Sequence, residues 1–330
     1  MNPVDIESKQ VFNPAISSLF SVKNKNVLIT GGSRGIGLMI GRTLAAHGAN
    51  IILTSRDSNA CAKAAASIQK YCSSLNCHAM NSGEERDEVI CAHVASNVGT
   101  REGCKKLAEY TKQVFRGRLD VLINNAGCSW GEDPYITNKQ ENESGKMNWG
   151  WDKVLDLNVK GLFYLTRECV PLLERNNSTS STIASAASYI DPGRVINIGS
   201  VAGMTPMKTP THAYDVSKAA VHHLTKKMAA DLAKKNITVN AIAPGFVETR
   251  MSLGLGKWVE QANMSSESSD VDGLKDMQRH IPLGRMGTEE DMAGACIYLS
   301  SRAGAWCTGV ILNVDGGTAG CLQIPLSSNL

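Results

Sequence analysis

The sequence predicts a doubly wound α/β fold, in which one seven-stranded parallel sheet is covered by helices on both faces. Short, predominantly apolar runs of strand length recur along the chain, amphipathic helical patterns separate them, and no linker interrupts the alternation. A length of 330 residues is ordinary for one α/β domain. We therefore expect a single domain over residues 22–320, with an N-terminal extension (1–21) and a C-terminal tail (321–330).

Seven runs rich in Val, Ile and Leu are predicted to form the strands. Short apolar runs bounded by polar residues are typical of strands that are buried on both faces of a sheet. The third strand has an alternative at residues 78–80, and we favour residues 89–94. The predicted strands are residues 26–30, 50–54, 89–94, 120–124, 194–198, 238–242 and 310–314.

Helical patterns lie between these strands, with apolar residues recurring every three or four positions. They predict helices over residues 36–47, 60–71, 101–115, 151–173, 212–235 and 289–299. Three polar or Ser/Thr-rich segments are predicted to be surface loops, at 80–88, 131–148 and 176–187. A fourth, at 254–278, follows a Pro-Gly pair and is either a lid over a substrate pocket or an exposed loop.

The overall charge argues against a nucleic-acid-binding protein. There are 34 basic and 31 acidic residues, with no long basic block. No apolar run approaches the length of a membrane span. The cysteines are scattered without a Cys-x-x-Cys pair or a signal peptide, which favours reduced thiols in a cytoplasmic protein.

The two ends of the chain bear on the location of the protein in the cell. Residues 1–21 carry Asp5 and Glu7 and lack an arginine-rich amphipathic pattern, which argues against a mitochondrial presequence. The chain ends Ser328-Asn329-Leu330, one residue away from the peroxisomal Ser-Lys-Leu signal. A cytoplasmic location is preferred, and a peroxisomal one is the alternative.

The motif T-G-G-S-R-G-I-G occupies residues 30–37, between the first strand and the first helix. Glycines let the backbone turn sharply and approach a pyrophosphate, and the following helix N-terminus offers unpaired N–H groups to it. A plain turn without a ligand is the alternative. The residues expected to contact a dinucleotide here are Gly31, Ser33, Arg34, Gly35, Ile36 and Gly37.

The end of the second strand indicates which dinucleotide is bound. An acidic residue there would bind the ribose of NAD, but this strand ends in Ser55 and Arg56. Arg34 lies in the glycine loop, so two guanidinium groups and a hydroxyl are available for a 2′-phosphate. Asp57 comes one position late and is expected to be a helix N-cap. The sequence therefore predicts NADP(H) as the cofactor.

Tyr214 and Lys218 are four residues apart, which places them on one face of a helix. An ammonium there favours the phenolate and makes the phenol a usable proton donor. Taken alone, Tyr214 could be a surface aromatic. His212, His222 and His223 have no carboxylate cluster beside them, so we expect structural or substrate-side histidines and no metal site.

These motifs resemble those of the short-chain dehydrogenases/reductases, a family with a single-domain Rossmann-like fold. The resemblance covers residues 25–317, and within the family the chain is most similar to 3-oxoacyl-(acyl-carrier-protein) reductases of the rhamnolipid-pathway type. The motifs that carry it, in order, are the glycine loop, N-N-A-G at 124–127, Asn158, Ser200, Tyr214 with Lys218, and Pro-Gly at 244–245.

The resemblance implies a role for each of four catalytic residues. Tyr214 would donate a proton to the carbonyl oxygen, and Lys218 would lower the pKa of Tyr214 and hold the nicotinamide ribose. Ser200 would hydrogen-bond the carbonyl as negative charge develops. Asn158 would hold a water molecule that connects Lys218 to solvent.

The resemblance also implies further cofactor contacts. These fall on Asn125, Gly127, Pro244, Gly245, Val247 and Thr249. The family commonly has Asp-Val at the end of the third strand, where this chain has His93 and Val94. Val94 is expected to pack against the adenine, whereas a contact from His93 is doubtful.

The expected activity is NADPH-dependent reduction of a ketone, either a 3-oxoacyl thioester or a related carbonyl. Two alternatives are a reductase of small free carbonyls or polyols and a non-catalytic NADP-binding sensor. An acidic acyl-carrier protein would need basic residues near the pocket, for which Lys208, Arg250 and Lys257 are candidates. The resemblance further implies a homo-oligomer, a tetramer or dimer, built on the helices at 151–173 and 212–235.

Overall fold

The computed structural model describes residues 15–82, 89–131, 146–175, 190–207, 209–254 and 273–320. Within these ranges the strands form one seven-stranded sheet in the order β3-β2-β1-β4-β5-β6-β7, and every neighbouring pair is parallel. The predicted fold class is confirmed. The strands are β1 (Asn26–Thr30), β2 (Asn50–Ser55), β3 (Cys91–Ala95), β4 (Val121–Asn124), β5 (Gly193–Ile198), β6 (Ile237–Pro244) and β7 (Ile311–Val314).

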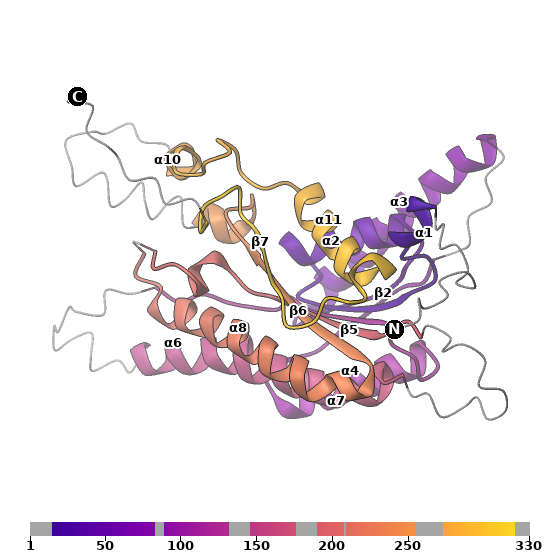
Figure 1. Ribbon diagram of the computed structural model, residues 1–330, viewed down its shortest axis with the longest axis horizontal. Coiled ribbons are helices and arrows are strands. Elements are labelled where there is room, and N and C mark those ends of the chain that lie inside the picture. The colour runs from indigo at the N-terminus through magenta and orange to yellow at the C-terminus, as the bar shows by residue number, and fades with distance from the viewer. Residues whose placement is uncertain are drawn as a thin grey trace, which may run out of the picture.

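Helices cover both faces of the sheet (Figure 1). One face carries α2 (Gly35–Ala46), α3 (Ser58–Ser82) and α11 (Glu289–Ser300). The other carries α4 (Arg101–Val114), α6 (Lys146–Leu155), α7 (Leu162–Leu173) and α8 (His212–Leu232). The shorter helices are α1 (Ile16–Leu19), η1 (Asp156–Gly161), η2 (Val201–Gly203), η3 (Ala233–Lys235), α10 (Gly273–Arg279) and η4 (Arg302–Gly304).

Two hydrophobic clusters lie on opposite faces of the sheet, because successive strand side chains point to opposite sides. Val27 and Ile29 of β1 belong to the cluster under α2 and α11, whereas Leu28 belongs to the cluster under α4 and α7. All three are fully buried. Burial on both sides explains why the central strands are predominantly apolar rather than alternating. None of the described helices is long and apolar enough to cross a membrane.

The helix boundaries differ from the prediction in three places. Helix α3 continues to Ser82, so residues 78–80 are helical and β3 is the favoured alternative. The predicted helix at 151–173 starts earlier, at Lys146, and is interrupted by the π-helix η1. Of the predicted lid, residue 254 ends a helical turn and α10 begins at Gly273, while residues 255–272 lie outside the described part. Most of the predicted loops at 131–148 and 176–187 also lie outside it.

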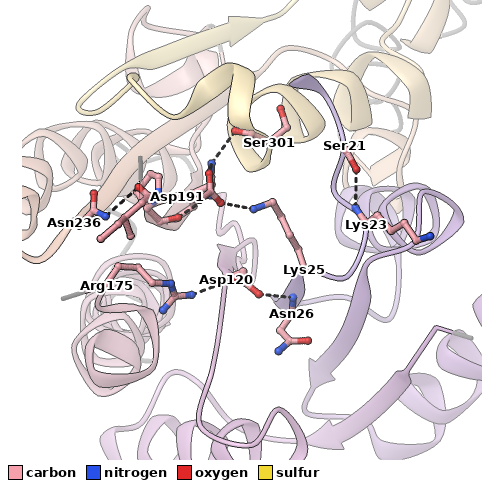
Figure 2. Close-up of polar contacts among 12 residues, drawn as sticks. Ser21, Lys23, Lys25, Asn26, Asp120, Arg175, Asp191, Asn236 and Ser301 are labelled. Carbon is pink, nitrogen blue, oxygen red and sulfur yellow. Dashed lines mark hydrogen bonds and ion pairs between the residues drawn. The ribbon is translucent and has the colours of Figure 1, made fainter. Parts of the chain in front are cut away.

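A cluster of buried charges lies where the strands begin, at the amino end of the sheet (Figure 2). Asp191 accepts from Lys25 Nζ at 2.6 Å and from both terminal nitrogens of Arg194, whose side chain is fully buried. Burial acts to raise the pKa of Asp191, but hydrogen bonds and charge from Arg194 and Lys25 outweigh it and hold the pKa well below its usual range. Asp120 accepts in the same way from Arg175 Nη2 at 3.0 Å. These contacts tie the starts of β1, β4 and β5 together.

Candidate active site

A cavity of about 750 Å³ opens at the other end of the sheet, where the strands finish. The chain passes from β1 out to β2 and β3 and then returns to β4 on the far side of β1. Ligands of doubly wound sheets bind at such a reversal, outside the carboxyl ends of the strands. The volume falls within the range of small-molecule and cofactor sites.

The glycine loop forms one wall of this cavity. Gly31 and Gly35 have φ values of +64° and +55°, which favour glycine. A Cβ on Gly37 would overlap the Asn125 side chain and the Gly31 backbone, so the loop packs directly against the end of β4. Helix α2 begins at Gly35 without a side-chain cap, and its first two residues, Gly35 and Ile36, line the cavity. This cradle fits a pyrophosphate.

Thr30 and Asn125 hold the glycine loop in place. The Thr30 hydroxyl accepts from the backbone N–H groups of Asn125 and Ala126 at 3.0 and 2.9 Å. The Asn125 amide donates in return to the Thr30 and Gly31 carbonyls at 2.9 and 3.2 Å. The N-N-A-G segment therefore fixes the shape of the loop as well as lining the cavity.

Arg34 and Arg56 line the cavity beyond the end of β2. Both side chains are exposed, and neither has a carboxylate partner within the described ranges. The donor set of two free guanidinium groups fits the 2′-phosphate of NADP. Ser55 Oγ contacts Cys61 Sγ at 3.0 Å and accepts from Asp57 N at 3.2 Å. Asp57 caps α3 by accepting from Ala60 N, which confirms the predicted N-cap.

Ser200, Tyr214 and Lys218 meet on the opposite wall. Ser200 follows β5 and starts the short helix η2, where its Oγ accepts from Ala202 N at 3.2 Å. Tyr214 and Lys218 lie one turn apart on α8, with Lys218 Nζ 5.5 Å from the centre of the Tyr214 ring. Lys218 Nζ donates to the Ile198 carbonyl at 2.7 Å. All three side chains line the cavity.

Burial controls the protonation of this group. It raises the pKa of Tyr214, and a hydrogen bond with Ser200 only partly opposes that shift. Burial lowers the pKa of Lys218 to about 8. We predicted that Lys218 would lower the pKa of Tyr214. In the structure the pKa of Tyr214 is raised, and Lys218 is not among the groups that shift it. At neutral pH Tyr214 carries its proton and Lys218 remains mostly charged.

Asn158 lies behind the cavity wall, in the π-helix η1. Its Oδ1 accepts from Cys128 N and its Nδ2 donates to Cys128 O, both at 2.9 Å. Nδ2 also donates to Ser217 Oγ at 2.9 Å, and Ser217 donates to the Tyr214 carbonyl at 2.7 Å. A Cβ on Gly127 would stand 3.3 Å from Asn158 Oδ1 and 3.7 Å from Lys218 Nζ. The side chains of Asn158 and Lys218 thus border the same small space beside Gly127.

The cavity lining includes most of the predicted contacts. Among the residues predicted to contact the cofactor, Gly37 and Val94 are not part of the cavity lining. At the end of β3 the lining is formed by Ser96, Asn97 and Val98 and not by Val94. Sequence reasoning missed Ser217, which is buried between Asn158 and Tyr214. Its position three residues after Tyr214 was the available signal. No group of three or more potential metal ligands occurs within the described residues.

The cavity lining also includes Ser129, Gly131, Met207, Pro210, Phe246 and Met251, with the polar residues Thr209, Thr211 and Ser252 of the same segments. Arg250 also lies there and is exposed. The two other basic residues predicted to face an acyl-carrier protein, Lys208 and Lys257, are outside the described residues. Met207, Pro210, Phe246 and Met251 give this lining apolar surface that suits the carbon chain of a substrate.

Comparison with known proteins agrees with this geometry. A family model described as enoyl-(acyl carrier protein) reductase, one of those for short-chain dehydrogenases/reductases, matches residues 31–319. The rhamnolipids biosynthesis 3-oxoacyl-[acyl-carrier-protein] reductase of Pseudomonas aeruginosa is 37% identical over 298 residues, which cover 90% of this chain and 97% of the relative. The 3-oxoacyl-[acyl-carrier-protein] reductase FabG of Chlamydia muridarum is 30% identical, covering 90% of this chain and 98% of the relative.

A solved structure resembles the whole fold. The Pseudomonas aeruginosa RhlG/NADP active-site complex superposes with a TM-score of 0.71 at 34% identity, covering 92% of this chain and 99% of that one. The family model spans most of the chain, and the relatives are covered over nearly their full length. This chain belongs to the short-chain dehydrogenase/reductase family.

Proposed function

We propose that the protein is an NADPH-dependent reductase that converts a ketone, of the 3-oxoacyl thioester class, into a secondary alcohol. The observation that carries the proposal is the convergence of Ser200, Tyr214 and Lys218 on one cavity, facing the glycine loop. The names of the two reductase relatives and the NADP in the RhlG complex support the substrate class and the cofactor.

In the proposed reaction NADPH, when bound, supplies the hydride. Tyr214 gives its proton to the carbonyl oxygen, which suits a phenol that burial keeps protonated. Ser200 Oγ accepts from Ala202 N, and its hydroxyl also hydrogen-bonds Tyr214. A carbonyl oxygen bound beside Tyr214 would take over that O–H donor, which would stabilise the developing negative charge. Lys218 then gives a proton back to Tyr214. A water molecule held by Asn158 would connect Lys218 to solvent and so replace that proton, and the hydrogen bond from Asn158 to Ser217 Oγ helps to hold the Asn158 side chain in place.

The pH dependence should follow Lys218. Its pKa is about 8, so the ammonium is present below that pH and is lost above it. The pKa of Tyr214 is raised, so Lys218 is the first of the two to lose its proton as pH increases. We expect kcat/KM for NADPH, which reports groups of the free enzyme, to fall above about pH 8 during ketone reduction. A profile that stays flat through this range contradicts the role of Lys218.

Arg56 should select NADPH over NADH. Arg56→Ala removes a guanidinium from the proposed 2′-phosphate site, and charged hydrogen bonds contribute about 1.5–3 kcal/mol. We expect the ratio of kcat/KM for NADPH to that for NADH to fall about 10- to 100-fold. Arg101→Ala, on α4 outside the cavity lining, is the matched control. Equal use of both cofactors by the unmodified protein refutes the assignment.

The substrate class is tested by NADPH oxidation with a panel of ketones. The panel should contain acetoacetyl thioesters, diketones, sugars and steroids. We expect the thioesters to have the highest kcat/KM, because Met207, Pro210 and Phe246 offer apolar surface to an acyl chain. Preference for small free carbonyls or polyols supports the first alternative. Tight NADPH binding with no turnover of any ketone supports the sensor.

Assembly and location complete the proposal. A homo-oligomer built on α6, α7 and α8 follows from the family, and the exposure of Trp149, Phe163 and Val216 on these helices supports it. A single monomeric species in analytical ultracentrifugation contradicts it. Eight cysteines of the described segments, Cys61 and Cys104 among them, carry free thiols, which is consistent with a cytoplasmic location.

A further inference from the structure

His222 lies on the same face of α8 as Tyr214 and Lys218, at successive steps of four residues. Each of the two later residues reaches a backbone group at the end of β5. Lys218 Nζ donates to the Ile198 carbonyl at 2.7 Å, and His222 Nε2 accepts from Ser200 N at 3.5 Å, the long end of the hydrogen-bond range. His222 therefore contacts the backbone of the residue proposed to hold the substrate carbonyl.

The loop that carries Ser200 is shaped around this imidazole. A Cβ on Gly199 would overlap His222 Nε2, and a Cβ on Gly203 would overlap the Lys218 and Ala219 backbone. His222 also hydrogen-bonds the Gly203 backbone, a bond that favours the protonated ring, so the ring donates in it. One imidazole thus accepts at the start of the loop and donates at its end.

The imidazole of His222 is held in its neutral form, which the contacts with the Ser200 and Gly203 backbones both need. His222 is 8% exposed, and burial, with help from the charge of Lys218, lowers its pKa to about 4. At physiological pH it is neutral, with one nitrogen free to accept and the other carrying a hydrogen. Its neighbour His223 is exposed and makes neither contact.

We propose that His222 is a positioning residue, which sets the place of Ser200 by bridging the Ser200 and Gly203 backbones. The inference rests on the proposed reductase function. The Ser200 hydroxyl accepts from Ala202 N within the same loop, so the loop backbone decides where its O–H points. Displacement of a catalytic group by about 1 Å can cost a hundredfold in rate.

Four variants test this. His222→Leu keeps the apolar bulk and removes both hydrogen bonds, and we expect kcat for ketone reduction to fall about 10- to 100-fold with the Kd for NADPH unchanged. His222→Gln offers both an acceptor and a donor and should recover most of kcat. His223→Leu should behave as wild type. Val221→Ala, a fully buried neighbour, should lower thermal stability and leave kcat unchanged.

A double-mutant cycle separates positioning from a general structural effect. Ser200→Ala alone should cost about 10²- to 10³-fold in kcat. If His222 acts through Ser200, His222→Leu should add little in that background. Three results would each overturn the inference about His222 while leaving the proposed function standing. They are a double variant in which the two losses of kcat simply multiply, a folded His222→Gln variant as slow as His222→Leu, and a His222→Leu variant with the kcat of the wild type. A wild-type protein that reduces no ketone overturns the proposed function as well.

Discussion

We expect Tyr214→Phe to lower kcat for ketone reduction by about 10³-fold, within the range for loss of a general acid, while the Kd for NADPH stays the same. Phenylalanine keeps the ring that lies 5.5 Å from Lys218 Nζ and removes only the hydroxyl. The glycine loop and Arg56 lie on the opposite wall and are untouched. Stopped-flow NADPH oxidation gives kcat, and quenching of protein fluorescence gives the Kd.

Tyr110→Phe is the matched control for this variant. It also removes one phenolic hydroxyl, which donates to the His93 carbonyl at 3.1 Å outside the cavity lining. Its kcat should be that of the wild type. If Tyr214→Phe retains a tenth or so of kcat, a fraction too large for loss of a general acid, Tyr214 is not the proton donor.

The second large effect concerns stability. Asp191→Asn leaves Arg194 and Lys25 without their anion, and removing one partner of a buried ion pair typically costs about 3–5 kcal/mol. Asp191 itself is one-third exposed, so we expect the lower end, about 3 kcal/mol, which corresponds to a fall in Tm of about 4–6 °C for a chain of this length. Differential scanning calorimetry measures it.

The pH dependence of this contribution has a definite sign. Because the folded-state pKa of Asp191 is depressed, its stabilisation is fully present above the ordinary carboxyl pKa of about 4 and is lost as the pH falls below it.

Asp231→Asn is the control for Asp191→Asn, since its pair with Lys227 is exposed and should contribute far less. Equal Tm values for Asp191→Asn and wild type contradict the importance of the cluster. kcat at low temperature should stay unchanged, because the cluster lies at the opposite end of the strands.

The sequence was sufficient for the parts of the structure that depend on neighbouring residues. The apolar runs located all seven strands because the sheet is buried on both faces, and strands of that kind need no alternation to be found. The glycine loop and the Tyr214 and Lys218 pair were likewise visible, since their geometry depends on one turn and one helix.

Other features depend on residues far apart in the chain and could not be predicted in this way. The π-helix η1 widens around Asn158, whose amide binds Cys128 thirty residues earlier, and no local pattern announces it. The pairing of Lys25 with Asp191 spans 166 positions. His222 could not be distinguished in the sequence from an ordinary histidine on a helix. Its contacts are with Gly199 and the residues after it, which follow β5, and only the folded structure brings the end of β5 beside α8.

The placement of Tyr214, Lys218 and His222 on α8 has a consequence for how such an enzyme can change. Helix pitch alone fixes the spacing of these side chains, so segments outside α8 can lengthen, shorten or be exchanged without altering it. The walls that would contact a substrate, at residues 207, 209–211 and 249–252, are such segments. Substrate preference and the proton-transfer apparatus are therefore separately mutable, and loop exchange between relatives should transfer the first without damaging the second.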